Sequence, residues 1–165
     1  MKTVLFCVPL AIFAADKGPD RVTKEVRHEL VMLPYYTVFD NLAYRVDGTR
    51  VSLFGQVVNP VLKSDAENVV KKIEGVSAVD NQIEVLPVSP NDDRLRRALF
   101  RAIYSRPDLE RYALGAIPAI HIIVKNGNVT LVGVVANQMD KNVAGVAANG
   151  VPGVFNVNNS LAVEK

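Results

Sequence analysis

The architecture is set by the stretch Val51-Ser52-Leu53-Phe54-Gly55-Gln56-Val57, because it returns later as Val129-Thr130-Leu131-Val132-Gly133-Val134-Val135. The two stretches lie 78 positions apart (129 − 51 = 78), and the same offset holds without a gap far beyond them. Identical pairs outside the stretch are Val46 and Val124, Asn59 and Asn137, Lys63 and Lys141, Ala66 and Ala144, Gly75 and Gly153, Val76 and Val154, Val79 and Val157, Asn81 and Asn159, and Val85 and Val163. Chance similarity rarely keeps one register across turns, helices and strands, so the chain contains two copies of one small domain.

The composition is that of a globular protein with a hydrophobic core. The chain has 165 residues, of which 49% are hydrophobic and 22% are charged, which is enough apolar material for a core. The formal charge is +2, from 19 Lys and Arg against 17 Asp and Glu. A charge so close to neutral excludes a protein whose main task is to neutralise a nucleic-acid backbone.

An amphipathic helix is expected to begin each copy. Apolar residues recur at helical spacing, and Pro34 and Pro107 end the two helices at equivalent places. Asp92 or Asp93 is expected to cap the second of these helices. The inward positions are Val22, Val26, Leu30 and Leu33 in the first copy and Leu95, Ala98, Leu99, Ala102 and Ile103 in the second.

A β-hairpin follows each helix. Apolar residues alternate on both sides of Asp47-Gly48 and Asn126-Gly127, dipeptides that accept the positive φ of tight turns. Gly55 and Gly133 fall on the core-facing side of the second strand, where the missing side chain is expected to let a helix approach.

A second helix and a last strand complete each copy. The helices are expected over 62–73 and 139–148, followed by Gly75 and Gly153, and the strands over 79–85 and 157–163. Gly145 and Gly150 are expected to shorten or fray the later helix, and Gly150-Val151-Pro152-Gly153 is interpreted as a turn. The fold class is therefore α+β, with two tandem α-β-β-α-β domains whose helices pack on one face of a three-stranded sheet.

The domain boundaries follow from this layout and from the first residues. We expect domains over 20–87 and 92–165, joined by a linker at 88–91. Residues 1–15 combine a basic start, the uncharged run Val4–Phe13 and the small pair Ala14-Ala15, which is typical of a signal peptide cleaved near Ala15. A buried first strand or helix is the alternative. Export would remove Cys7, the only cysteine, and place a chain without disulfides in the periplasm or outside the cell.

The repeated pattern resembles a known family. Val-x-Leu-x-Gly-x-Val on a strand, a helix carrying Ala66 or Ala144, and then Gly-Val-x-x-Val-x-Asn is similar to the BON domain, named for bacterial osmotic-shock and nodulation proteins. The resemblance covers nearly the whole chain after its first residues, twice. It implies a non-enzymatic, usually periplasmic module that binds phospholipid or other envelope components, with a role in envelope integrity or osmotic stress.

Catalytic and cofactor chemistry is not indicated. His28 and His121 stand at non-equivalent places, both expected to be solvated, and no metal-ligand spacing, Gly-x-Ser-x-Gly elbow or phosphate loop occurs. We therefore expect no enzyme, no metal and no cofactor.

The candidate binding site lies on the first helix of the second copy. With the apolar residues inward, Arg94, Arg97, Arg101 and Tyr104 are expected to face outward, with Phe100 at the boundary. Basic residues beside aromatic rings suit the headgroup region of an anionic bilayer. A merely solvated helix face is the alternative.

The far faces of the two sheets are also unusually apolar. Their outward residues are Phe54 and Val58 in the first copy and Ile123, Val132 and Val134 in the second. We expect a cover for them, supplied by the other copy or by a second chain in a homo-oligomer. The sequence thus predicts an exported protein that binds anionic phospholipid, with possible protein partners in the envelope. A protein-interaction or peptidoglycan-associated scaffold is the alternative.

Overall fold

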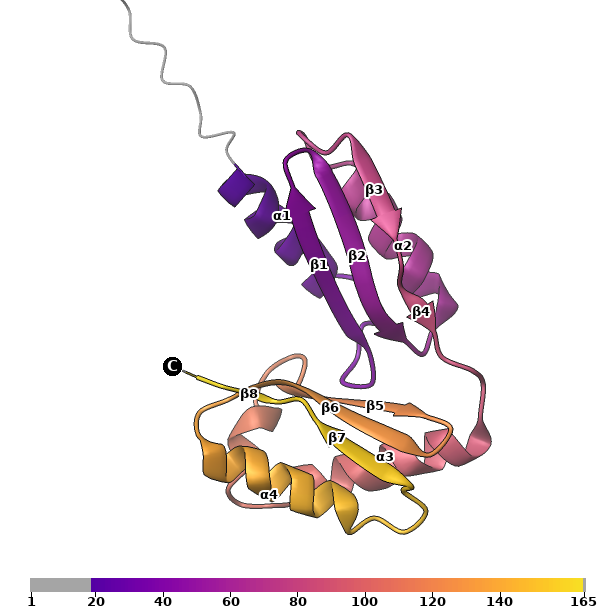
Figure 1. Ribbon diagram of the computed structural model, residues 1–165, viewed down its shortest axis with the longest axis vertical. Helices are drawn as coiled ribbons and strands as arrows, with labels where there is room; N and C mark the ends of the chain where they lie inside the picture. Colours follow the sequence, from indigo (N-terminus) through magenta and orange to yellow (C-terminus); the bar gives the residue numbers. More distant parts are fainter. Residues whose placement is uncertain (1–18, 165) are drawn as a thin grey trace, which may run out of the picture.

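The computed structural model describes residues 19–164 and contains two α+β units built in the same order (Figure 1). The first unit consists of α1 (Pro19–Val31), β1 (Asn41–Asp47), β2 (Arg50–Val57), α2 (Pro60–Lys71), β3 (Ala78–Asn81) and β4 (Glu84–Val85). The second consists of α3 (Pro90–Tyr104), the 3-10 helix η1 (Glu110–Ala113), β5 (Ile120–Lys125), β6 (Asn128–Val135), α4 (Gln138–Asn149), β7 (Asn156–Asn159) and β8 (Ala162–Val163). The tandem arrangement expected from the repeat is confirmed. None of the helices formed by residues 19–164 is both long and apolar enough to cross a bilayer.

Each sheet is centred on the strand that carries the repeated motif. β2 pairs antiparallel with β1 and parallel with β3 and β4, and β6 pairs in the same way with β5, β7 and β8. The single last strand expected in each copy is interrupted at Asn81 and Asn159. Each asparagine donates from Nδ2 to a helix carbonyl, Lys63 O at 2.8 Å and Lys141 O at 2.7 Å, and accepts from the amide two residues on. The repeated asparagine therefore ties the last strand to the second helix.

The predicted helix faces form the two cores. Val22, Val26, Leu30 and Leu33 are buried against β2 and α2, and Leu95, Leu99 and Ile103 are buried against β5 and β6. In the second unit both helices cover one face of the sheet, as Figure 1 shows.

The glycines of the central strands have a different purpose from the one expected. Gly55 has φ +115° and Gly133 has φ +138°, and a Cβ there would lie 1.9 Å from Asn41 O and 2.0 Å from Ala119 O. The close neighbour is the backbone of the adjacent strand and not a helix, so the predicted reason was wrong. The six glycines singled out by the sequence, Gly48, Gly55, Gly75, Gly127, Gly133 and Gly153, all have positive φ.

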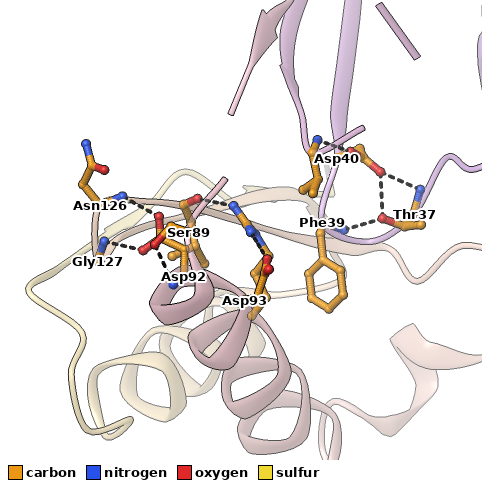
Figure 2. Close-up of polar contacts among 11 residues, drawn as sticks. Thr37, Phe39, Asp40, Ser89, Asp92, Asp93, Asn126 and Gly127 are labelled. Carbon is orange, nitrogen blue, oxygen red and sulfur yellow. Dashed lines mark hydrogen bonds and ion pairs between the residues drawn. The ribbon is translucent and has the colours of Figure 1, made fainter. Parts of the chain in front are cut away.

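Two local expectations for the second copy were also wrong. Ser89 caps α3 by accepting from Asp92 N at 3.2 Å, while the buried Asp92 carboxylate accepts from the amides of Asn126 and Gly127 and fixes the β5–β6 turn. Figure 2 shows this contact. α4 is not shortened, since it has 12 residues like α2. Gly145 is buried in α4 because Asn159 Nδ2 lies 2.8 Å from where a Cβ would stand.

The two units meet where the α1–β1 loop of the first reaches the edge strand of the second. Ile122 N donates to Val38 O at 2.8 Å, and Val38 is 7% exposed within the hydrophobic core of the second unit. Lys125 Nζ lies 2.5 Å from Glu84 Oε1. Val38 and Phe39 form a turn closed by the hydrogen bond from Asp40 N to Thr37 O, and this turn satisfies one backbone amide on the free edge of β5.

His121 belongs to this junction and is not solvated as expected. Its imidazole stacks on Tyr36, with 5.7 Å between ring centroids, and burial lowers its pKa. The sequence placed His121 correctly opposite the core of its own sheet. It could not show that the other copy covers that face.

The expectation that the copies cover each other's sheets holds only in part. Ile123 is buried, whereas Val132 is half-buried and Val134 is 54% exposed. In the first sheet Phe54 and Val58 are half-buried, and the Arg45 guanidinium lies 5.9 Å from the Phe54 ring.

Candidate functional site

Arginines form a row along the outer side of α3. Arg94, Arg97 and Arg101 are exposed, because the apolar residues of the helix turn toward the sheet. Arg96 is different: it is buried, with Nη1 2.5 Å from Asp93 Oδ1 and Nη2 donating to Val124 O at 2.7 Å. The outward positions expected for Arg94, Arg97 and Arg101 are therefore confirmed.

Two of these arginines are unpaired. Arg94 donates to Asn91 Oδ1 at 2.9 Å, an uncharged partner. Arg97 and Arg101 have no hydrogen-bond or ion-pair partner among residues 19–164. Their guanidinium groups are therefore free to bind an anion.

Aromatic rings lie directly beside this row. Phe100 is half-buried, 6.3 Å from the ring of Phe39 in edge contact and 4.9 Å from the ring of Tyr104. Figure 2 shows Phe39 projecting from the loop of the first unit alongside α3. A shallow cavity of about 300 Å³ opens here, lined by Val38, Phe39, Arg97, Phe100 and Arg101. We call these five residues the α3 groove.

Tyr104 does not face outward, and that expectation was wrong. It is 9% exposed, and its hydroxyl donates to Ile120 O at 2.7 Å and accepts from Ile120 N at 3.1 Å. Burial raises the pKa of Tyr104 to about 12. The ring points to the sheet because the edge strand β5 presents unpaired backbone groups that the hydroxyl satisfies.

A second exposed apolar strip lies on the neighbouring helix α4. Met139 is 72% exposed and Val146 is 68% exposed, and together with Arg106, Asn142 and Val143 they line a cavity of about 440 Å³. In α2 the positions equivalent to Val143 and Val146 hold Asp65 and Asn68. We call Met139, Val143 and Val146 the α4 strip.

The sequence analysis missed both Phe39 and the α4 strip. Val38 and Phe39 stand in a loop outside any helical or strand periodicity, so no pattern assigned them to a core. The α4 strip could have been found by comparing the copies, because apolar residues replace polar ones at aligned surface positions.

Acidic groups near α4 serve the structure. Asp140 accepts from Tyr112 Oη at 2.5 Å, from Asn137 Nδ2 at 3.1 Å and from Arg111, and the Tyr112 hydroxyl and the Arg111 guanidinium lower its pKa. In the described part of the chain, no three His, Cys, Asp or Glu side chains are grouped so that they could hold a metal ion. The site is thus a surface of free cations and apolar side chains.

The chain was compared with solved structures and with curated proteins. Two solved structures of CdsD, a structural protein of the type III secretion system of Chlamydia trachomatis, are 13% identical to the chain. One has a TM-score of 0.30 and covers 86% of this chain and 96% of its own; the other has a TM-score of 0.31 and covers 87% and 92%. Comparison with curated proteins gives no match.

The family model of the BON domain matches twice, at residues 20–87 and 91–165. Domains of this family are of a non-catalytic binding type and are associated with phospholipid binding and cell-envelope roles. The chain therefore belongs to the BON domain family, with two BON domains in tandem.

Proposed function

We propose that this protein binds the surface of anionic phospholipid membranes in the cell envelope through the α3 groove and the adjoining Arg94. The observation that carries the proposal is the pair Arg97 and Arg101, both exposed and without an acidic partner, beside the rings of Phe39 and Phe100. Each cation near an anionic leaflet contributes about 1 kcal/mol, and an apolar ring at headgroup depth adds area burial.

The site draws on both domains. Val38 and Phe39 come from the first copy, and the arginines and Phe100 come from the second. The domains at about 20–87 and 92–165 therefore form one binding surface together and are not independent binding modules. α3 begins at Pro90, so the segment expected as a linker already contributes its first residues to this helix.

The test is sedimentation with vesicles of neutral lipid and with vesicles that also contain anionic lipid. Arg97→Glu combined with Arg101→Glu reverses four units of charge, and binding to anionic vesicles should fall more than tenfold. Arg50→Glu with Lys72→Glu makes the same charge change on exposed residues of the first domain and should bind much as the wild type does. An equal loss of vesicle binding in both variants would show that binding depends on the net charge of the protein and not on the α3 groove. If the wild-type protein does not bind anionic vesicles, the scaffold alternative is favoured.

Export is the second part of the proposal. Residues 1–15 lie outside the described residues, and their support is the order of basic, apolar and small residues in the sequence. Mass spectrometry of protein from native envelope fractions should find an N-terminus near Asp16. An intact Met1 in the cytoplasm would contradict export.

A further inference from the structure

The contact between the two domains uses a notch whose counterpart is present in both domains of this chain. In the second domain the notch lies between α3 and the free edge of β5, bounded by Ile103, Tyr104, Ile120 and Ile122. Val38 of the first domain fills it and accepts a hydrogen bond from Ile122 N. The core of the second domain is thus completed by a segment of the first.

The equivalent notch of the first domain is filled only in part, by Tyr36 of its own loop. A cavity of about 300 Å³ opens between α1 and the edge strand β1, lined by Arg27, Leu30, Val31, Tyr36, Leu42 and Tyr44. Leu30 and Val31 correspond to Ile103 and Tyr104 at an offset of 73, and Leu42 and Tyr44 correspond to Ile120 and Ile122 at an offset of 78. The two notches therefore have the same place in the fold, and only that of the second domain has an occupant from another domain.

The backbone at the notch of the first domain is also ready for a partner strand. In the β1–β2 register Tyr44 occupies the place that Ile122 has in β5, so its amide points to the open edge. Among residues 19–164 that amide has no acceptor, whereas Ile122 N has Val38 O. An exposed edge of this kind is a template for strand addition.

The loop that corresponds to the donor lies in the second domain, where Leu109 and Tyr112 anchor its first half on that domain and residues 114–116 at its tip are exposed. The segment from Pro107 to Ile120 is five residues longer than that from Pro34 to Leu42 (13 against 8), and it exposes Leu114 at 82%. Ala116 and Ile117 align with Val38 and Phe39. At the tip of the loop Leu114 and Ala116 are exposed, whereas Ile117 is half-buried.

Charge favours the same pairing. The exposed charged residues of α1 are basic, namely Lys24, Arg27 and His28, and Arg27 lines the notch. The loop carries exposed Asp108 and Glu110, while its exposed Arg111 is paired with Asp140. Opposite charges at two surfaces orient their encounter and disfavour other partners.

We propose that the tip of the 107–119 loop, residues 114–117 with the exposed Leu114, inserts into the α1–β1 notch of a second copy of this chain, and so builds head-to-tail assemblies. The contact joins two different surfaces, so it leaves one free loop and one free notch at the ends of every dimer. Such a contact continues into open chains or closes into rings.

Sedimentation velocity without lipid tests the proposal, because the wild type should associate at about 100 μM while variants with one damaged surface stay monomeric. Leu114→Asp damages the loop, and Val31→Asp, at a residue 47% exposed, damages the notch. Met139→Asp and Val61→Asp, at residues 72% and 46% exposed, are matched controls that should associate as the wild type does.

Mixing the two damaged variants gives the decisive measurement. Leu114→Asp keeps an intact notch and Val31→Asp keeps an intact loop, so the mixture should form 1:1 dimers and nothing larger. A wild type that stays monomeric would overturn the proposal. So would association that survives in either variant, or a mixture that remains monomeric. Vesicle binding is measured separately, so failure here leaves the proposed lipid surface standing.

Discussion

The same backbone amide, at equivalent positions of the two domains, donates to a different acceptor in each domain. Just after the central strand, Val58 N donates to Asp40 Oδ1 at 2.7 Å in the first domain, and Ala136 N donates to Tyr112 Oη at 2.8 Å in the second. Asp40 also accepts from the amide and hydroxyl of Thr37, which shapes the short loop that presents Val38 and Phe39 to the other domain. Tyr112 comes instead from η1 in the longer loop.

This difference between Asp40 and Tyr112 distinguishes a requirement of the fold, an acceptor for the amide, from a feature specific to each copy, the residue that supplies it. Both copies must satisfy that amide, so an acceptor is present in each, but the residue that supplies it follows from the task of the loop. The same holds on the second helix, where Asp65 and Asn68 of α2 face solvent and Val143 and Val146 of α4 form an apolar strip. Core positions agree between the copies, and the surface positions that disagree include those for which we propose a function.

The largest effect should come from breaking what the copies share. Gly55→Ala and Gly133→Ala would each place a Cβ about as close to a backbone oxygen as a covalent neighbour, so each should destabilise its domain by more than about 3 kcal/mol. Gly48→Ala, with positive φ but no atom within 4 Å of the new Cβ, should cost only about 1 kcal/mol. Urea unfolding of the three variants measures this, and equal losses at Gly48 and Gly133 would show that φ alone sets the cost.

The next effect tests the junction between the copies. Val38→Asp places an unpaired carboxylate in the second domain's core and should cost about 3 kcal/mol, with hydrogen exchange increasing first at β5. The aligned variant Ala116→Asp lies on an exposed loop and should change stability by less than about 0.5 kcal/mol. Loss of protection confined to the first domain after Val38→Asp would contradict the assignment of Val38 to the second core.

The sequence predicted the layers of the fold because periodic apolar residues, turn glycines and the repeat all depend on local geometry. It placed Arg94, Arg97 and Arg101 outward for the same reason. It misplaced Tyr104 because the need of Ile120 for a hydrogen-bond partner arises only once β5 is an edge strand. Phe39 was missed, and His121 was wrongly expected to be solvated, because their partners lie in the other domain and a contact between domains leaves no periodic signal.

A smaller effect should come from the α4 strip. Met139→Ser with Val146→Ser removes exposed apolar area without changing charge, so vesicle binding at low salt should change little. In high salt, where surface charges are screened, binding should fall about fivefold, which corresponds to about 1 kcal/mol of lost apolar contact. Val61→Ser, at the position of α2 aligned with Met139, is the control and should have no effect. Unchanged high-salt binding by the α4 variant would restrict the membrane contact to α3.

The smallest effect concerns pH at the junction. Burial lowers the pKa of His121 below its usual value of 6.5, an effect that the nearby Asp40 only partly offsets. The neutral imidazole is therefore favoured in the folded state. The contribution of His121 to the free energy of unfolding is fully present above about pH 6.5, and it is lost as the pH falls from there through the pKa of the folded state. Carboxylates with lowered pKa, such as Asp140, act in the same direction but only near pH 4. Between pH 7.5 and 5.5 the wild type should thus lose unfolding free energy that His121→Gln does not lose. His28→Gln, at an exposed position of α1, should keep the wild-type dependence. If His121→Gln loses as much unfolding free energy as the wild type between pH 7.5 and 5.5, the stacking of this imidazole on Tyr36 is insensitive to protonation, and the junction does not open with acid.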